Sequence, residues 1–329
     1  MGRPWAVGRR IFFAMEPERS HLVAQRLLGL PLPWARIGGA VDDPALETDL
    51  AGVRLRNPVG LAAGFDKTLA HLGPLGELGF GYVVGGTITR APRQGNAKPR
   101  IVRHPERGAL VNAMGLPNPG AERAARTLAR GRRTCPRFVS VADEAIEDAV
   151  ATVELVAPRA DGLELNASCP NVSWGRDRDT EAHLRALVAA IVERASVPLF
   201  VKLPPFAEPG EREAVLALAA IAQEAGARGL TCGNTRPVED PSLAVGRGGL
   251  SGRPLWPGTL EAVREVLDAT GGELPVNACG GVARVDDVAA CLAAGAATVQ
   301  VYTVLIYEGP RLPGLLTAGL VKGTAAARS

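Results

Sequence analysis

The chain has 329 residues, of which 47% are hydrophobic and 22% are charged, and its formal net charge at pH 7 is +3. This length and composition are typical of one large globular domain or two ordinary ones, and the small net charge indicates no nucleic-acid surface. No apolar run reaches the ~18 residues that span a bilayer, and five cysteines without C-x-x-C spacing favour reduced thiols over a disulfide scaffold or a metal site.

Residues 1–45 predict a small helical extension. An aromatic-rich stretch from Trp5 to Met15 precedes Pro17, which fits the first turn of a second helix that ends at Gly29. Charges interrupt the apolar residues and no small-residue cleavage site follows them, which argues against a secretory signal. Two short amphipathic helices with basic and tryptophan flanks predict either a segment on a membrane surface or one that packs on the domain behind it.

Short apolar runs then alternate with stretches of helical period. We predict strands at residues 59–63, 82–86, 138–142, 162–166, 199–203, 229–232, 275–278 and 298–302. The helical stretches between them include residues 145–156, 180–195, 211–225, 260–269 and 285–293. This alternation predicts an α/β protein, a (β/α)8 TIM barrel with an N-terminal helical extension. A doubly wound open sheet is the rival, but no G-x-G-x-x-G run follows the first strand.

In such barrels the chemistry takes place at the carboxyl ends of the strands. The predicted strands deliver amides, hydroxyls, lysines, a thiol and glycines there: Lys67, Thr87, Ser140, Asn166, Cys169, Lys202, Asn234, Thr235, Gly280, Gly281, Tyr302 and Thr303. Only four of the 37 basic residues are lysines, so lysines at this rim are candidates for a chemical role. The insertion at residues 89–119 adds Asn112, and a loop of that length is usually functional.

The stretch at residues 163–172 is the centre of the functional prediction. An apolar strand runs into Asn166, Cys169 and Asn171, with a proline directly after the thiol. Such a loop delivers a thiol and two amides to one place, although read alone it is equally a turn with a buried cysteine. Later glycines let backbone N–H groups approach an anion and suggest a phosphorylated cofactor across the barrel mouth: Gly249, Gly252, Gly280 and Gly281.

Taken in order, these residues resemble the FMN-dependent dihydroorotate dehydrogenases. The resemblance covers nearly the whole chain, the head included, and in this order its motifs are highly specific. The matching stretches are residues 57–67, 86–87, 95–100, 112–116, 166–171, 201–203, 234–235, 249–254 and 280–281.

Two classes of that family share features with this chain. The head and residues 249–255 resemble the membrane-associated, quinone-using class 2, in which the base is normally serine. Cys169 instead resembles the soluble class 1. Ser140 begins a stretch where class 2 usually has an Asn-x-Gly-Lys-Asn run, Gly233 stands where it often has threonine, and Val304 replaces a glycine. These departures leave the electron acceptor and the flavin affinity open.

The resemblance implies that dihydroorotate is oxidised to orotate by loss of a proton from C5 and of a hydride from C6 to N5 of FMN. Cys169 matches the base, and a thiol performs this role when its surroundings lower its pKa. Asn112, Asn166, Asn171 and Asn234 match the amides that hold the pyrimidine ring and its carboxylate, since orotate presents both donors and acceptors.

Two lysines match the charged groups of the family's site. Lys202 matches the lysine at the flavin N1–O2 edge, where negative charge accumulates on reduction, and Lys67 matches one near the flavin and the substrate carboxylate. The further substrate contacts implied are Met114, Gly115, Leu116 and Thr235. The FMN contacts implied are Ala63, Gly64, Lys67, Thr87, Ser140, Asn166, Lys202, Gly252, Gly280, Gly281, Tyr302 and Thr303. By contrast, Cys232 and Cys279 are interpreted as core thiols at strand ends.

The resemblance implies a membrane- and quinone-associated extension at residues 1–45 and an FMN-binding catalytic barrel at residues 46–329. It places the protein peripherally on the cytoplasmic side of the cell membrane, with a role in pyrimidine biosynthesis, electrons passing via FMN to a quinone, and no nucleic acid or metal. Three alternatives stay open: a soluble, fumarate-type acceptor, another dihydropyrimidine-like substrate, and a non-catalytic paralogue that keeps the barrel.

Overall fold

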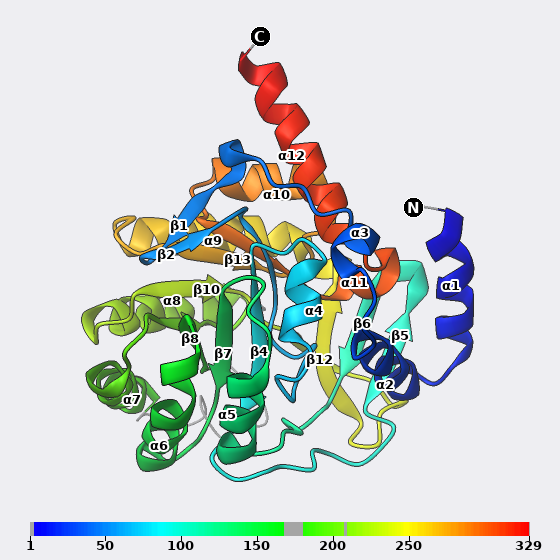
Figure 1. The fold of residues 1–329 in the computed structure, drawn as a ribbon. Helices are drawn as coiled ribbons and strands as arrows, with labels where there is room; N and C mark the ends of the chain where they lie inside the picture. Colours follow the sequence, from blue (N-terminus) through cyan, green and yellow to red (C-terminus); the bar gives the residue numbers. More distant parts are fainter. Residues whose placement is uncertain (1–2, 168–179, 207–208, 329) are drawn as a thin grey trace.

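The computed structural model describes residues 3–167, 180–206 and 209–328, and its centre is a closed barrel (Figure 1). In this part of the chain, eight parallel strands follow one another around the barrel and the last pairs with the first. They are β3 (Val59–Leu61), β4 (Tyr82–Ile88), β7 (Arg137–Val141), β8 (Gly162–Asn166), β9 (Leu199–Lys202), β10 (Gly229–Cys232), β13 (Val276–Cys279) and β14 (Thr298–Val301). Each overlaps a predicted strand, so the predicted TIM barrel is confirmed and the open sheet is excluded.

Helices surround the barrel because their apolar residues recur at intervals of three and four and form one face. In α7 that face is Leu184, Leu187, Val188 and Ile191, all of them buried. The helices are α4 (Leu72–Glu77), α5 (Ala121–Arg130), α6 (Ile146–Val156), α7 (Thr180–Arg194), α8 (Pro209–Glu224), α9 (Trp256–Ala269), α10 (Val285–Ala293), α11 (Thr303–Glu308) and α12 (Leu312–Arg328). The end of α12 extends away from the barrel (Figure 1).

The amino-terminal end of the barrel interior is filled by aromatic rings. Tyr82, Phe138 and Phe200 form a row in which neighbouring ring centroids lie 5.2 and 5.6 Å apart. Glycines on neighbouring strands make room for them: a Cβ at Gly229 would lie 2.1 Å from the ring of Phe200. A hairpin of β1 (Thr48–Leu50) and β2 (Val53–Leu55) packs buried leucines against this cluster. The chemistry is therefore left to the opposite, carboxyl end.

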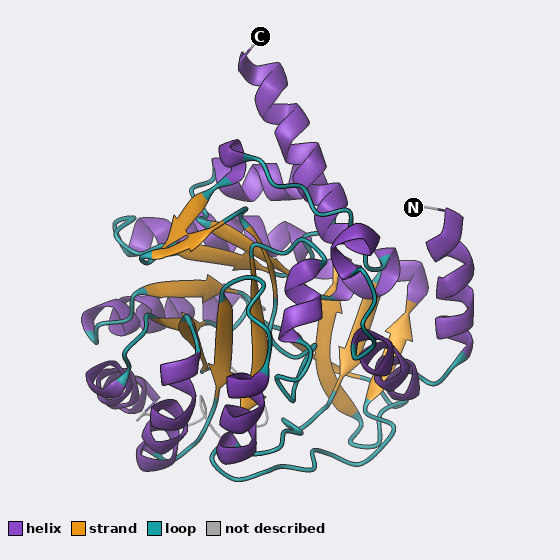
Figure 2. Ribbon diagram, in the orientation of Figure 1, coloured by secondary structure: helices purple, strands orange, loops and turns teal. Residues whose placement is uncertain are grey.

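A second sheet lies beside that carboxyl end (Figure 2). It is antiparallel and contains β11 (Arg236–Glu239), β12 (Arg247–Gly252), β6 (Ala109–Asn112) and β5 (Ile101–His104), in that order. The insertion at residues 89–119 is therefore partly strand, where the sequence predicted only a long loop. Pairing of β6 with β12 sets Asn112 opposite Gly249 at the barrel mouth.

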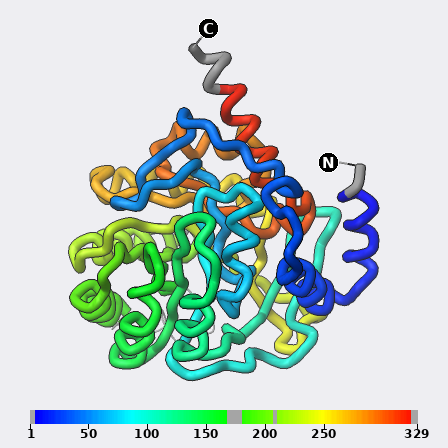
Figure 3. Tube along the Cα trace, viewed as in Figure 1, coloured from blue at the N-terminus to red at the C-terminus, as the bar shows by residue number. Residues whose placement is uncertain are grey.

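The head consists of α1 (Arg3–Ala14), α2 (Pro17–Leu28) and the short α3 (Trp34–Gly38). As predicted, Pro17 begins α2 and Gly29 ends it, and the carboxylate of Glu16 caps the first turn. The head lies against segments from much later in the chain (Figure 3). The indole of Trp5 donates a 2.8 Å hydrogen bond to the carbonyl of Tyr307, which fixes α1 beside α11.

Candidate active site

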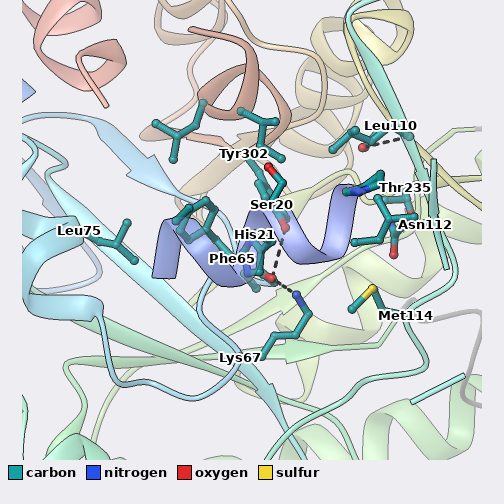
Figure 4. A pocket seen from close by; sticks show the side chains of 18 of the residues that line it. Ser20, His21, Phe65, Lys67, Leu75, Leu110, Asn112, Met114, Thr235 and Tyr302 are labelled. Carbon is teal, nitrogen blue, oxygen red and sulfur yellow. Dashed lines mark hydrogen bonds between the residues drawn. The ribbon is translucent and has the colours of Figure 1, made fainter. Parts of the chain in front are cut away.

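A cavity of about 350 Å³ is lined both by the head helices and by the barrel mouth (Figure 4). The head contributes mainly apolar side chains, among them Phe12, Phe13 and Leu27, together with His21. The barrel contributes the predicted site residues Ala63, Gly64, Lys67, Thr87, Asn112, Met114, Gly115, Leu116, Asn166, Lys202, Asn234, Thr235 and Tyr302. One space therefore joins an apolar entrance to a polar interior.

A second cavity of about 630 Å³ adjoins the first and shares Lys202, Asn234 and Tyr302 with it. Its lining also includes the predicted cofactor contacts Gly252, Gly280, Gly281 and Thr303. Ser140 lines neither cavity; it is fully buried, with its hydroxyl 3.0 Å from that of Thr87, which lines the first. Cys169 and Asn171 lie outside the described residues. The other predicted residues are thus gathered at one end of the barrel.

A chain of hydrogen bonds orients the amides of the barrel mouth. The amide nitrogen of Asn234 donates to the carbonyl of Asn166 at 3.1 Å, and the amide nitrogen of Asn166 donates to the hydroxyl of Thr87 at 3.2 Å. The carbonyl of Asn234 also accepts from the backbone N–H of Thr235 at 2.8 Å. Because these bonds hold each amide in one orientation, they also determine which donors and acceptors the amides present to the cavity.

Lys67 carries the cation on one side of the first cavity. Its ammonium donates to the carbonyl of Gly64, which also accepts from the hydroxyl of Tyr302 at 3.4 Å (Figure 4). Burial lowers the pKa of Lys67 to about 8, and the positive charge of Arg100 acts in the same direction. This ammonium is therefore a cation that titrates close to neutral pH.

Lys202 carries the second cation, at the end of β9 where the two cavities meet. Its side chain is only 7% exposed, and its ammonium lies 3.3 Å from the carboxylate of Glu164, which is 1% exposed. Burial alone would lower the pKa of Lys202, but the negative charges of Cys279 and Glu164 and their hydrogen bonds outweigh it and raise the pKa. Lys202 is accordingly a cation at neutral pH.

The head meets the barrel through a buried ion pair and a half-buried imidazole. The guanidinium of Arg100 donates to the carboxylate of Glu18 at 2.6 Å, and both side chains are about one-tenth exposed. His21 lies with its ring edge-to-face on Phe65 at 5.0 Å, and no described group forms a hydrogen bond with its Nε2. Burial lowers the pKa of His21 to about 3, so the imidazole is neutral beside the cavity.

The second cavity fits a phosphorylated cofactor in the shape and chemistry of its lining. Gly281 has a φ of +69°, and a Cβ there would lie 2.4 Å from the backbone nitrogen of Trp256. Gly252 has a φ of +95°, and a Cβ there would lie 2.3 Å from the carbonyl oxygen of Gly108. Only glycine is accommodated at either position, and the bare backbone lets an anion approach N–H groups closely. Lys202, Arg253 and Arg284 bring positive charge to the lining of the same cavity.

Several residues of the site escaped the sequence prediction. The sequence patterns assign no role to Glu164, which lies inside an apolar strand. A charged residue in such a run is itself an indication of a buried, paired charge. Cys279 was interpreted as a core thiol, but it is half-buried and lines the second cavity beside Lys202. The contribution of His21 depends on how the head docks, which the local sequence does not encode.

Comparison with known proteins follows the same direction as the geometry. A sequence model of the family described as dihydroorotate dehydrogenase matches residues 45–322. A relative from Novosphingobium aromaticivorans named dihydroorotate dehydrogenase (quinone) is 35% identical over 331 residues, which cover 96% of this chain and 94% of the relative. A relative of the same name from Anaeromyxobacter dehalogenans is 39% identical over 338 residues, which cover 97% of this chain and 92% of the relative.

Among solved structures, a DHODH from Eimeria tenella in complex with ferulenol has a TM-score of 0.82 at 30% sequence identity. The match covers 94% of this chain and 92% of that one. The ligand-free form of the same protein has a TM-score of 0.81. The similarity therefore includes the head as well as the barrel.

Proposed function

This chain belongs to the dihydroorotate dehydrogenase family, and we infer that it oxidises dihydroorotate to orotate in pyrimidine biosynthesis and passes the electrons to a quinone. One observation carries the choice of substrate: the amides of Asn112, Asn166 and Asn234 line a single cavity with two lysines. The relatives named for quinone favour that acceptor over a soluble, fumarate-type one. The assembled cations and amides argue against a barrel that has lost its chemistry.

The amides bind the substrate ring because a dihydropyrimidine presents both donors and acceptors around its rim. The hydrogen-bond chain from Asn234 through Asn166 to Thr87 holds them in place before the substrate arrives, which reduces the ordering cost of binding. Lys67 binds the substrate carboxylate through a charge-assisted hydrogen bond. We assign the further substrate contacts to Asn171, Met114, Gly115, Leu116 and Thr235.

FMN is the proposed cofactor, and it would bind in the second cavity. Gly252, Gly280, Gly281 and Thr303 would hold its phosphate and ribityl chain, and Lys202 would lie at the edge of its ring system. When bound, FMN supplies the acceptor for the hydride from C6 of dihydroorotate. The role of Lys202 is to keep a fixed positive charge in a desolvated place, where it counts for more than in water.

Cys169 is the proposed base, and its thiolate takes the proton from C5 of dihydroorotate. Although Cys169 itself lies outside the described residues, β8 ends at Asn166, whose side chain lines the cavity. Cys169 follows Asn166 by three positions in the chain. The positive charges of Lys202 and, below about pH 8, of Lys67 would favour the thiolate over the thiol.

We propose that residues 1–45 form the quinone- and membrane-associated extension, and that residues 46–329 form the catalytic barrel. Among the described helices, none combines the length and the apolar composition that crossing a bilayer requires. The head instead exposes large apolar side chains: Val7, Ile11, Leu22, Leu27, Leu30 and Leu32. Such a surface suits peripheral contact on the cytoplasmic side of the membrane, and the apolar first cavity suits the entry of a quinone from that side.

Anaerobic mixing tests the reaction directly. FMN-loaded protein should lose its flavin absorbance when dihydroorotate is added, and a ubiquinone analogue should restore it faster than fumarate does. Dihydrouracil, which lacks the carboxylate, is the matched control and should bleach the flavin far more slowly. A protein that binds FMN but is not bleached by dihydroorotate would contradict the proposed substrate.

A further inference from the structure

The carboxylate of Glu164 is buried in the centre of the barrel and is fully hydrogen-bonded. One oxygen faces the ammonium of Lys202 at 3.3 Å. The other accepts from the hydroxyl of Thr231 at 3.0 Å and from the amide nitrogen of Gln300 at 2.9 Å. Four neighbouring or facing strands, β8, β9, β10 and β14, therefore converge on one side chain that is 1% exposed.

This carboxylate is the centre of a polar layer between the aromatic rings and the cavities. The amide nitrogen of Asn277 lies 3.3 Å from the hydroxyl of Thr231, and the hydroxyl of Thr298 donates to the carbonyl of Asn277 at 2.6 Å. The hydroxyl of Tyr82 lies 2.8 Å from that of Thr298. A connected network holds each member in one orientation, so the position of Glu164 is strongly determined.

Lys202 and Glu164 differ in their access to the cavities. Lys202 lines both of them, whereas Glu164 is part of neither lining among the described residues. The negative charge is therefore behind the positive one as seen from the proposed flavin. Among the described residues that line the second cavity, Lys202 and Gln300 are the two that form a hydrogen bond with this carboxylate, and Lys202 is the charged one.

We propose that Glu164 is a positioning residue that holds the ammonium of Lys202 charged and directed at the flavin-binding cavity. This inference rests on the proposed function, because it concerns the cation that would stabilise the reduced flavin. Glu164 lines neither cavity, so its charge acts through Lys202, the charged partner that does. A buried ion pair adds little to stability compared with apolar residues of the same volume, so its value here is a fixed charge.

If Lys202 lost its charge as pH rises, the midpoint potential of the bound flavin would change with pH. Glu164 suppresses that dependence because it keeps Lys202 charged. Burial favours the neutral amine of Lys202, and Glu164 opposes that effect. The other titratable groups that face the pair are the thiol of Cys279, from β13, and the phenol of Tyr82, from β4. Burial raises the pKa values of both. An ionised Cys279 also raises the pKa of Lys202, so Glu164 is the counter-charge while Cys279 keeps its proton.

The test measures the midpoint potential of bound FMN between pH 6 and 10 by titration with dithionite against a reference dye. In Glu164→Gln, the potential should exceed the wild-type value at low pH, because a negative charge near the flavin is gone. The difference should shrink and reverse as pH rises, because Lys202 of the variant loses its charge first. The inflection of the variant's curve should lie at least about one pH unit below any wild-type inflection. An opposite charge at this distance moves the pKa of Lys202 by that much or more.

Thr231→Val is the matched control, because it removes a hydrogen bond to the same carboxylate without changing any charge. Its potential should follow the wild-type pH dependence with at most a constant offset. Parallel curves for Glu164→Gln and the wild type would overturn the proposal. A pH-dependent reversal in Thr231→Val equal to that in Glu164→Gln would also overturn it, since packing alone would then suffice.

If Glu164→Gln does not fold well enough to bind FMN, a stability measurement tests the pairing instead. Lys202→Met strands a buried carboxylate, and adding Glu164→Gln removes it, so the double variant should unfold at higher denaturant concentration than Lys202→Met alone. A double variant that is no more stable would overturn the pairing. Dithionite reduces the flavin without substrate, so failure of dihydroorotate to bleach the wild type would contradict the proposed reaction while leaving this test intact.

Discussion

Binding of orotate should weaken steeply above pH 8, because Lys67 loses its charge there. Burial lowers the pKa of this ammonium to about 8, so the charged form is complete at low pH and is lost as pH rises through that value. If only the charged form binds the carboxylate, the dissociation constant is multiplied by one plus the ratio of neutral to charged lysine. That factor is about two at pH 8 and about ten at pH 9.

The assay is the change in the flavin spectrum on titration with orotate between pH 6.5 and 9, with no turnover to involve the catalytic base. Lys67→Arg keeps its charge throughout this range, so its dissociation constant should stay flat. Lys67→Met should bind about 10- to 100-fold more weakly than the wild type at pH 7, the cost of one charge-assisted hydrogen bond. A wild-type constant that does not change between pH 7 and 9, or an Arg variant that follows the wild type, would refute the assignment.

Three further predictions concern the base, the glycines of the proposed FMN site and the head. Cys169→Ala should slow flavin bleaching by dihydroorotate at least about 100-fold, the usual contribution of a positioned base, whereas Cys169→Ser should retain activity with its optimum at higher pH. Gly281→Ala should yield protein that holds little FMN after purification, because its Cβ would lie 2.4 Å from a backbone nitrogen, whereas Gly258→Ala meets nothing within 4 Å and should keep the flavin. Glu18→Gln should weaken docking of the head by about 3 kcal/mol, because it leaves the guanidinium of Arg100 buried without its counter-charge; quinone reduction should fall while flavin bleaching persists.

Each of these predictions has an outcome that contradicts it. An unimpaired Cys169→Ala variant would mean that the base lies elsewhere. Equal flavin content in the two glycine variants would show that Gly281 is not part of the FMN site. For the head, Glu47→Gln is the control, because its pair with Arg54 is exposed and surface pairs contribute little. Loss of flavin bleaching together with quinone reduction in Glu18→Gln would show that the pair supports the whole site.

The barrel strands were predictable because a parallel strand buried on both faces is a short apolar run between turn residues. The second sheet was not, since β6 pairs with β12, more than 130 positions later in the chain. Nothing within residues 89–119 encodes that partner, and their glycines and prolines suggest a loop. The aromatic row has the same character: Gly229 is visible in the sequence, but the fact that it faces Phe200 depends on the register between strands.

For the candidate site too, the sequence predicts which residues meet but not which of them form hydrogen bonds or ion pairs with one another. Asn166, Asn234 and Lys202 were predictable because strand ends of a barrel converge, whatever the detailed register. The hydrogen bonds between them, and the carboxylate behind Lys202, require the folded chain. Sequence patterns therefore predict which groups meet at the mouth, while the protonation states of those groups follow from burial and neighbours that only the structure shows.

Two buried ion pairs among the described residues have the same physical effect. Glu164 pairs with Lys202 behind the proposed flavin cavity, and Glu18 pairs with Arg100 where the head meets the barrel. Desolvation makes such pairs poor contributors to stability, yet removal of one partner is costly. A pair of this kind penalises displacement of either side chain more than it strengthens the fold. That property suits two places where the proposed function needs fixed geometry: the cation beside the proposed flavin cavity and the helix that borders the apolar entrance.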